Sequence, residues 1–409
     1  MSEPLAATIE RHLVALVDGY PDRHPGRPGN TAASDYVEGV LRAHGWAVES
    51  VDFEVLDADV GPARLSVGGR AFELLAGPYT VPASVRAPLL PVDSLAALEG
   101  ADIGGAVVVL HGDIAADQLF PKSFDFVDAP DHRRIYELLE SGAPAAVIGA
   151  TGRGGGMGGG LYPYPLIEDG DFDLPNAYTT DEIGAQLAPL AGRVAELEIV
   201  AQRRTGWARQ LTAARGPAGA PRALVMAHID SKGGSPGALD NATGVAALLG
   251  VAELLAEYDG PYRVELIPMN GEDYYANSGE HLFVAANEGR WDELLGTVNM
   301  DAIGAKGAST AASLYSVSAR GAELIGRVMR RHPTVSLGEA WYESDHSIVA
   351  GHGRPAIALT STSFRELSAS VTHTQRDTLE LADPALVAGA AEFVADLVRS
   401  LPAVGGPEA

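Results

Sequence analysis

The sequence of 409 residues contains no cysteine. Disulfide bonds, thiolate nucleophiles, cysteine-bound zinc and iron–sulfur clusters are therefore excluded. Any metal ion must be held by histidine, aspartate and glutamate. The chain also lacks an unbroken apolar stretch of about 18 residues, the length that a membrane-spanning helix needs, so we predict no membrane partner.

Basic residues are scarce as well. Lys and Arg total 29 against 54 Asp and Glu, which gives a formal net charge of −25. A nucleic-acid backbone would be repelled by this charge, so we predict no nucleic-acid partner. Carboxylates are, however, the hard oxygen ligands that divalent cations favour. The N-terminus has no basic start followed by an apolar stretch, and we therefore predict no secretory signal and a cytoplasmic location.

The composition and apolar pattern of the chain change near residues 57 and 203, which predicts two domains. Residues 1–57 read as helix, helix and strand, with the strand at 47–56 leading into a short polar turn around Asp59. Residues 58–202 are rich in Gly and Pro, with β-like runs at 105–112 and 145–150. We predict that 58–202 form a β-rich domain inserted into a catalytic domain made of 1–57 and 203–409, with the basic tract 201–210 as a solvated link.

After residue 203 strands and helices alternate. The apolar patterns predict strands at 223–227, 262–269, 297–300, 313–318 and 355–360, and helices at 243–258, 278–288, 320–331 and 384–400. Such alternation is typical of an α/β fold, in which helices sandwich a mostly parallel mixed sheet.

Polar side chains follow three of these strands closely: His228 and Asp301 come directly after theirs, and Glu272 with Asp273 comes after Asn270 and Gly271. Ligands of open α/β sheets bind at the carboxyl ends of the strands, where these side chains are expected to meet. Asp240 opens the next predicted helix, and His373 lies in a loop after the strand at 355–360, so both can reach the same edge. Taken singly, Asp240 reads as a helix N-cap and His228 as a structural hydrogen-bonding group. Their joint occurrence favours a site.

The residue types suit a two-metal centre. Two divalent ions about 3.5–4 Å apart need a bridging carboxylate and roughly two further ligands each, which leaves room for a water with a pKa near about 7. That count is met by His228, Asp240, Asp273, Asp301 and His373. Glu272 can take a proton from the water and return it to a leaving amine. The Asp230 carboxylate can accept the other imidazole N–H of His228.

Six short segments resemble the motifs of the co-catalytic zinc aminopeptidases, whose relatives include glutamate carboxypeptidase, glutaminyl cyclase and the transferrin receptor. They are HID (228–230), GALDNATGV (237–245), NGED (270–273), NMD (299–301), ESDH (343–346) and HTQRDT (373–378). The resemblance covers 1–57 and 203–403. It implies two zinc ions bridged by Asp240, with His228 and Asp301 on one and Asp273 and His373 on the other. It also implies Glu272 as the general base, and the insert is similar to a protease-associated domain.

The chain departs from that family at one ligand and carries three further candidates. Asp273 stands where the family usually has a second Glu, and its shorter arm is expected to lower the affinity for that metal or shift its position. Asp345 matches an acidic position that helps glutaminyl cyclases hold substrate, and here it contacts a substrate amine or orients another group. Tyr342, with Trp341, lines a substrate pocket or belongs to the core. His346 supports a neighbouring group or is structural.

These features predict metal-dependent hydrolysis of a peptide or amide bond, most simply the release of N-terminal amino acids by metal-bound water with Glu272 as base. The alternatives are glutaminyl-cyclase-like cyclisation, hydrolysis of a small amide metabolite, and a silent scaffold such as the transferrin receptor. Cyclases use one zinc and usually lack an inserted domain, and silent relatives lose ligands that this chain keeps. Side-chain preference and oligomeric state are not encoded in any motif.

Overall fold

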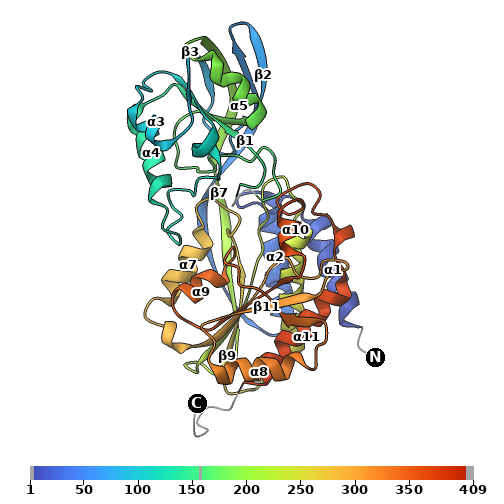
Figure 1. Ribbon diagram of the computed structural model, residues 1–409. Helices are drawn as coiled ribbons and strands as arrows, with labels where there is room; N and C mark the ends of the chain where they lie inside the picture. The colour runs from blue at the N-terminus through green and yellow to red at the C-terminus, as the bar shows by residue number, and fades with distance from the viewer. Residues whose placement is uncertain (1–3, 156–158, 402–409) are drawn as a thin grey trace. The chain divides into compact units, whose positions relative to one another are not determined.

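The computed structural model describes residues 4–155 and 159–401 (Figure 1). Contacts within the chain divide it into two compact units, Met1–Val55 with Trp207–Ala409, and Leu56–Gly206. The sequence-based division at 58–202 differs from the second unit by a few residues at each end. Within the described ranges, no helix is both long and apolar enough to cross a membrane.

The sheet of the first unit is mostly parallel, and the predicted fold class is confirmed. Its strand order is β7-β9-β8-β10-β13-β11-β12. Neighbours from β9 to β13 run parallel, whereas β7 and β11 pair antiparallel with β9 and β13. The strands are β7 (Val194–Arg215), β8 (Arg222–His228), β9 (Arg263–Met269), β10 (Leu294–Met300), β11 (Thr310–Tyr315), β12 (Val335–Leu337) and β13 (Ala356–Ser361).

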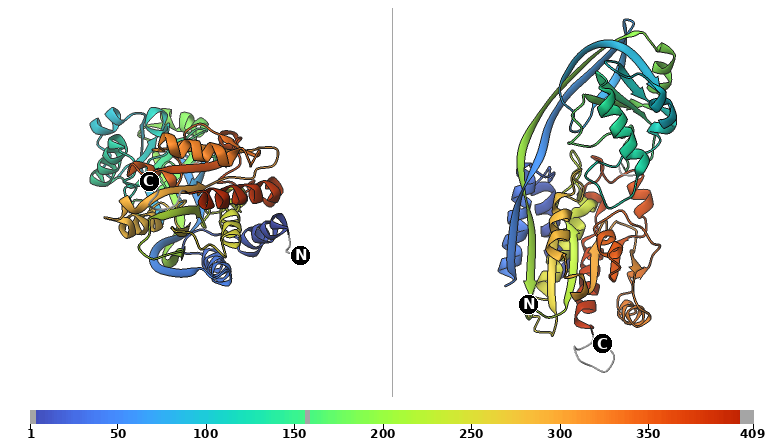
Figure 2. Two further views of the ribbon diagram at one scale, coloured as in Figure 1. Left: turned by 90° about the horizontal axis from the view of Figure 1, so that it is seen from below. Right: turned by 90° about the vertical axis from the view of Figure 1, so that its left-hand side faces the viewer.

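Helices lie on both faces of this sheet, as Figures 1 and 2 show. On one face α1, α6 and α11 contact one another and share the main core, and α2 contacts α6. Helix α9 packs against β10 and β13. The helices are α1 (Leu5–Val14), α2 (Pro28–Ala43), α6 (Thr243–Leu254), α7 (Ser278–Asn287), α8 (Ala319–Met329), α9 (His346–Gly351), α10 (Phe364–Ser368) and α11 (Pro384–Arg399), with π turns at Ala15–Gly19 and Ala238–Ala242 and 3-10 turns at Trp291–Glu293 and Leu379–Leu381.

The second unit has its own sheet and two cores of buried apolar side chains. Its strands follow the order β2-β6-β5-β4-β3-β7, with β1 paired to β2. The elements are β1 (Ala47–Val67), β2 (Arg70–Ala76), β3 (Ala83–Val92), α3 (Leu95–Gly100), β4 (Val107–Leu110), α4 (Pro130–Gly142), β5 (Ala146–Thr151), β6 (Asn176–Thr180), α5 (Asp181–Leu187) and 3-10 turns at Gly112–Ala115 and Ala188–Leu190. Its similarity to a protease-associated domain stays a prediction.

One of the two predicted links is wrong: instead of a polar turn at Asp59, strand β1 runs without a break through this position. The predicted link at 201–210 contains the point where the first unit resumes, at Trp207. Its residues 201–207 are partly or fully exposed and belong to strand β7. The polar residues pair across the strands: Arg204 Nε donates to Asp57 Oδ2 at 2.7 Å. Main-chain hydrogen bonds hold neighbouring strands together whatever their side chains are. Paired charges can therefore stand where a half-buried strand usually shows alternating apolar side chains, and the sequence pattern does not reveal such a strand. Strand β11 likewise begins three residues before the predicted 313–318 and ends at Tyr315, before Ser316 with φ +50°.

A pH-sensitive contact joins α1 to α2. His12 Nδ1 lies 2.7 Å from the Tyr36 hydroxyl, and burial, together with the charges of Arg11 and His44, lowers the pKa of His12 to about 4. The unfolded chain therefore binds a proton more readily than the folded one between pH 6.5 and 4, and stability falls as the pH falls through this window. We expect the loss from this residue at pH 5 to be about 2 kcal/mol.

His12→Gln, which cannot titrate, should reduce the difference between the urea midpoints at pH 7.5 and pH 5 by the corresponding amount. An unchanged difference in the variant would contradict the assignment of this pH dependence to His12.

Candidate metal centre

Three adjacent strands bring the predicted residues to one edge of the sheet. Strand β8 ends on His228, which is fully buried, and pairs in parallel with β9 and β10. The segments after β9 and β10 carry Glu272 with Asp273, and Asp301. Because the three strands run in the same direction, their carboxyl ends lie side by side.

Asp240 lies in the π turn that precedes α6. The main-chain N–H groups of Leu239 and Asp240 donate to the Asp377 carboxylate at 2.7 and 3.0 Å. Helix α6 begins later, with Ala242 at its N-cap position and no side-chain cap. Asp240 is therefore not a helix cap, and its side chain is available to the cluster. Asp377 was not singled out from the sequence.

One carboxylate faces both histidines. Asp240 Oδ1 lies 3.1 Å from His228 Nε2, and Asp240 Oδ2 lies 3.2 Å from His373 Nε2. Asp273 Oδ1 is 3.0 Å from His373 Nε2, and Asp301 Oδ1 is 3.7 Å from His228 Nε2. Three overlapping groups have all their ligand atoms within 4.8 Å of one another: His228, Asp240 and Asp301; Asp240, Asp273 and His373; and His228, Glu272 and Asp273.

The cluster fits divalent cations. His228 Nε2 and Asp273 Oδ2 are buried and have no hydrogen-bond partner. Burial alone would lower the pKa of His228, but Glu272, Asp230 and neighbouring carboxylates raise it well above its ordinary value. Buried carboxylates thus outnumber the positive groups around them. Two imidazoles with several carboxylate oxygens at this spacing are a ligand set for zinc or a similar ion.

Glu272 lies beside the ligands. Its Oε2 is 3.9 Å from His228 Nε2. Burial raises the pKa of Glu272 well above its usual range, and Asp273 and Asp301 act in the same direction against the opposing charge of His228. The geometry therefore permits either a ligand or a proton-transfer role.

Asp230 acts differently from the prediction. Its carboxylate accepts main-chain N–H bonds from Gly271 at 2.7 Å, Glu272 at 3.3 Å and Asp273 at 2.9 Å. His228 Nδ1 lies 3.2 Å from the Asp230 carbonyl oxygen and 3.7 Å from the carboxylate. The main chain, not the carboxylate, makes the closer contact with the imidazole. Gly271 has φ +111°, which side-chain-bearing residues rarely adopt, so the turn closes around the carboxylate.

The candidate substrate residues lie in contrasting settings. Asp345 is fully buried, neither of its oxygens has a hydrogen-bond donor, and burial raises its pKa to about 7. Its carboxyl interacts with that of Glu280, a buried residue that the sequence analysis missed. Burial favours the alternative that Asp345 orients another group. Tyr342 is 63% exposed, whereas Trp341 packs in the core against Phe364.

His346 is structural by its contacts. It is fully buried, and its Nε2 lies 2.9 Å from the Trp341 carbonyl oxygen.

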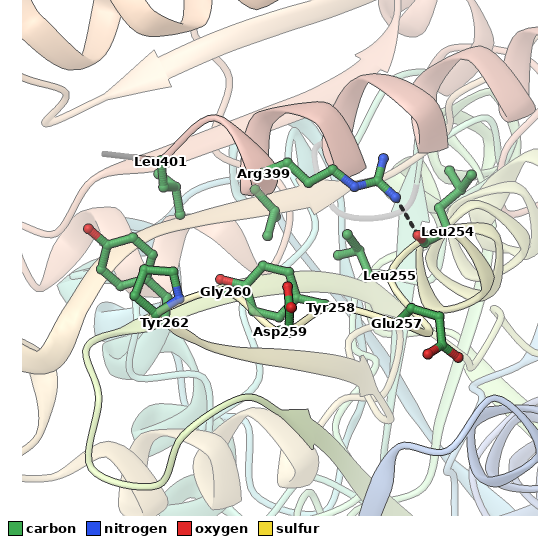
Figure 3. A pocket seen from close by; sticks show the side chains of 11 residues that line it. Leu254, Leu255, Glu257, Tyr258, Asp259, Gly260, Tyr262, Arg399 and Leu401 are labelled. Atoms are coloured by element: carbon green, nitrogen blue, oxygen red, sulfur yellow. Dashed lines mark hydrogen bonds between the residues drawn. The ribbon is translucent and has the colours of Figure 1, made fainter. Parts of the chain in front are cut away.

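A cavity of about 290 Å³ lies away from the cluster (Figure 3). It is lined by Tyr258, Tyr262 and Arg399, and Arg399 donates to the Leu254 carbonyl. The cavity lies where β9 begins, whereas the cluster lies where β9 ends.

Removing the Asp230 acceptor should destabilise the first unit even without metal. In Asp230→Ala the buried N–H groups of Gly271 and Asp273 lose their acceptor, at a cost of about 1–3 kcal/mol each. The urea midpoint measured in EDTA should fall accordingly. Asp230→Asn keeps one acceptor oxygen and should lose less. Equal midpoints for wild type and Asp230→Ala would show that these bonds do not hold the turn.

Comparison with known proteins agrees with this picture. The model of Peptidase family M28 matches residues 212–398. The probable lipoprotein aminopeptidase LpqL of Mycobacterium tuberculosis is 28% identical over 242 residues, which are 56% of this chain and 44% of LpqL. The match thus spans less than half of that relative.

Two solved structures resemble the whole chain. The aminopeptidase from Aneurinibacillus sp. strain AM-1 has a TM-score of 0.78 at 20% identity, covering 98% of this chain and 94% of that one. BSAP, a zinc aminopeptidase from Bacillus subtilis, has a TM-score of 0.73 at 17% identity, covering 99% and 97%. At these identities the likeness shows the fold. The match to the model of Peptidase family M28 is confined to residues 212–398, within the first unit.

Proposed function

We propose that this chain is a zinc-dependent metallopeptidase that releases N-terminal amino acids from peptides. The observation that carries the proposal is the position of Asp240, whose two oxygens lie 3.1 and 3.2 Å from two different histidines. A carboxylate so placed suits a pair of ions. The match to the family model supports peptide hydrolysis, and the names of the relatives support an aminopeptidase.

In this proposal Asp240, His228 and Asp301 would hold one zinc ion, and Asp240, Asp273 and His373 would hold the other. Bound zinc polarises a substrate carbonyl and lowers the pKa of water. A cytoplasmic location, a peptide or small amide as partner, and the absence of nucleic-acid and membrane partners belong to the same proposal.

Glu272 is proposed as the general base. It accepts the proton of the attacking water and donates it to the nitrogen of the leaving amine. Its main chain is held by the Asp230 carboxylate through the Gly271–Asp273 turn. This places a carboxylate beside the ligands on a fixed turn, within 3.9 Å of His228 Nε2. Proximity of this kind is what proton transfer requires.

Replacing the base should separate chemistry from metal binding. In Glu272→Gln we expect kcat for an aminoacyl p-nitroanilide to fall by about 10²–10⁴-fold, with bound zinc and folding retained. Zinc content by atomic absorption and far-ultraviolet circular dichroism provide the control. Turnover at the wild-type rate in this variant would refute the role.

The short arm of Asp273 should limit metal binding. Asp273→Glu, which restores the family's longer side chain, should tighten the weaker zinc site by about tenfold, or about 1.4 kcal/mol of binding free energy. Calorimetric titration of the metal-free protein measures both sites. Unchanged or weaker binding would show that the backbone already compensates for the shorter arm.

A substrate panel tests the aminopeptidase part separately. Free and N-acetylated aminoacyl amides should be compared after addition of zinc or cobalt, and the free amines should be preferred. Preference for the acetylated members would replace the aminopeptidase assignment and leave the hydrolase intact. A peptide with N-terminal Gln that releases ammonia without shortening would identify cyclisation instead.

A further inference from the structure

Arg23 is among the largest side chains that are completely buried in the described part of the chain. It lies between the π turn Ala15–Gly19 and helix α2, far in sequence from the matched residues 212–398. Burying a guanidinium is costly unless its donors are satisfied. Its hydrogen bonds therefore indicate what it is there to hold.

The guanidinium donates four hydrogen bonds, all to main-chain carbonyl oxygens. Nε donates to Ile229 at 2.9 Å, Nη1 to Leu16 at 2.9 Å and to Pro236 at 3.0 Å, and Nη2 to Gly237 at 2.7 Å. Three of the four acceptors thus belong to the segment 229–237, at its two ends. This segment connects His228 to Asp240, so Arg23 ties together the two ends of the loop that separates these proposed ligands.

The loop closes tightly on the guanidinium. Gly237 has φ +62°, and a Cβ at this position would lie 2.7 Å from Arg23 Nη2 and 2.6 Å from the Asp240 carbonyl oxygen. A side chain at position 237 would therefore push apart the guanidinium and the segment that carries Asp240. Contact this close leaves little freedom in the spacing of the loop.

The same N-terminal segment also reaches the turn that carries Glu272. Asn30 Nδ2 donates to the Arg23 carbonyl at 2.7 Å and to Asn270 Oδ1 at 2.8 Å, and Asn270 Nδ2 donates back to Asn30 Oδ1 at 3.0 Å. Both asparagines are fully buried. Asn270 directly precedes Gly271, so two loops of the cluster are attached to one short segment.

Charge adds to this geometry. Burial lowers the pKa of Arg23 to about 10, against the opposing effect of Asp377, Asp230 and other carboxylates of the cluster. The guanidinium thus stays positive at neutral pH. A fixed positive charge near several buried carboxylates offsets part of their mutual repulsion.

We propose that Arg23, held by Asn30, is a positioning residue of the metal centre, which sets the separation of His228 and Asp240 by clamping the loop between them. The inference rests on the proposed function, because it takes this cluster to bind zinc. A lysine cannot replace the clamp. Its ammonium is a single point with three donors, whereas the planar fork of arginine reaches carbonyls on several sides.

Arg23→Lys tests the clamp because it keeps the charge. The matched control is Arg222→Lys, since Arg222 is also buried and bonds to Glu265 at 2.9 Å and Asn287 at 2.6 Å, at the opposite end of β8 from His228. For each protein we would measure zinc affinity by competition with a chromophoric chelator, the urea midpoint in EDTA, and the visible spectrum of the cobalt form.

We expect Arg23→Lys to bind zinc about 10–100-fold more weakly than wild type, with an altered cobalt spectrum. Arg222→Lys should lose stability in EDTA but keep the wild-type zinc affinity and spectrum. Wild-type zinc affinity in Arg23→Lys, or an equal loss of affinity in Arg222→Lys, would overturn the inference.

Asn30→Ala provides a milder second variant in case Arg23→Lys does not fold. It should weaken zinc binding in the same direction but by a smaller factor, and unchanged affinity in this variant would also count against the clamp. Wild-type protein that binds no zinc would overturn the proposed function together with the inference, whereas zinc-binding wild type with unaffected variants would overturn the inference alone.

Discussion

Carboxylates that are buried close together repel one another, and the first unit gathers many of them at one edge of its sheet. Asp230, Asp240, Asp273 and Asp301 are all almost completely removed from solvent. Each needs hydrogen-bond donors or positive charge, because an uncompensated buried charge is among the most costly features a fold can carry. The surrounding loops are arranged to supply these donors.

Main-chain N–H groups meet this demand at Asp230. Two aspartates that are not proposed ligands accept N–H groups from the segments that carry the proposed ones: Asp377 holds Leu239 and Asp240, and Asp230 holds the turn from Gly271 to Asp273. The ligand side chains are then free to face one another and a cation. The carboxylates that hold the loops are thus different from those proposed to bind metal, and the first set positions the second.

Strands with buried apolar side chains were recognisable from the sequence, whereas a strand with polar side chains that pair across the sheet was not. The apolar runs of β8, β9, β10 and β13 predicted a mostly parallel sheet because strands covered on both faces are apolar throughout. The polar stretch around Asp59 was misread as a turn, because ion pairs such as Arg204 with Asp57 stabilise a strand whose side chains look like those of a loop. The role of Asp230 was partly wrong for a related reason: its carboxylate accepts main-chain N–H groups, which every residue except proline possesses.

By itself, the sequence determined the kind of fold and the identity of the polar residues at the strand ends, because both follow from local apolar patterning and from the order of residues along the chain. Only the tertiary structure decided that the two oxygens of Asp240 face different histidines. It alone also revealed Arg23, whose contacts with the loop before Asp240 span more than two hundred positions of sequence. Such contacts are long-range and use main-chain carbonyls, so no local pattern of side chains records them.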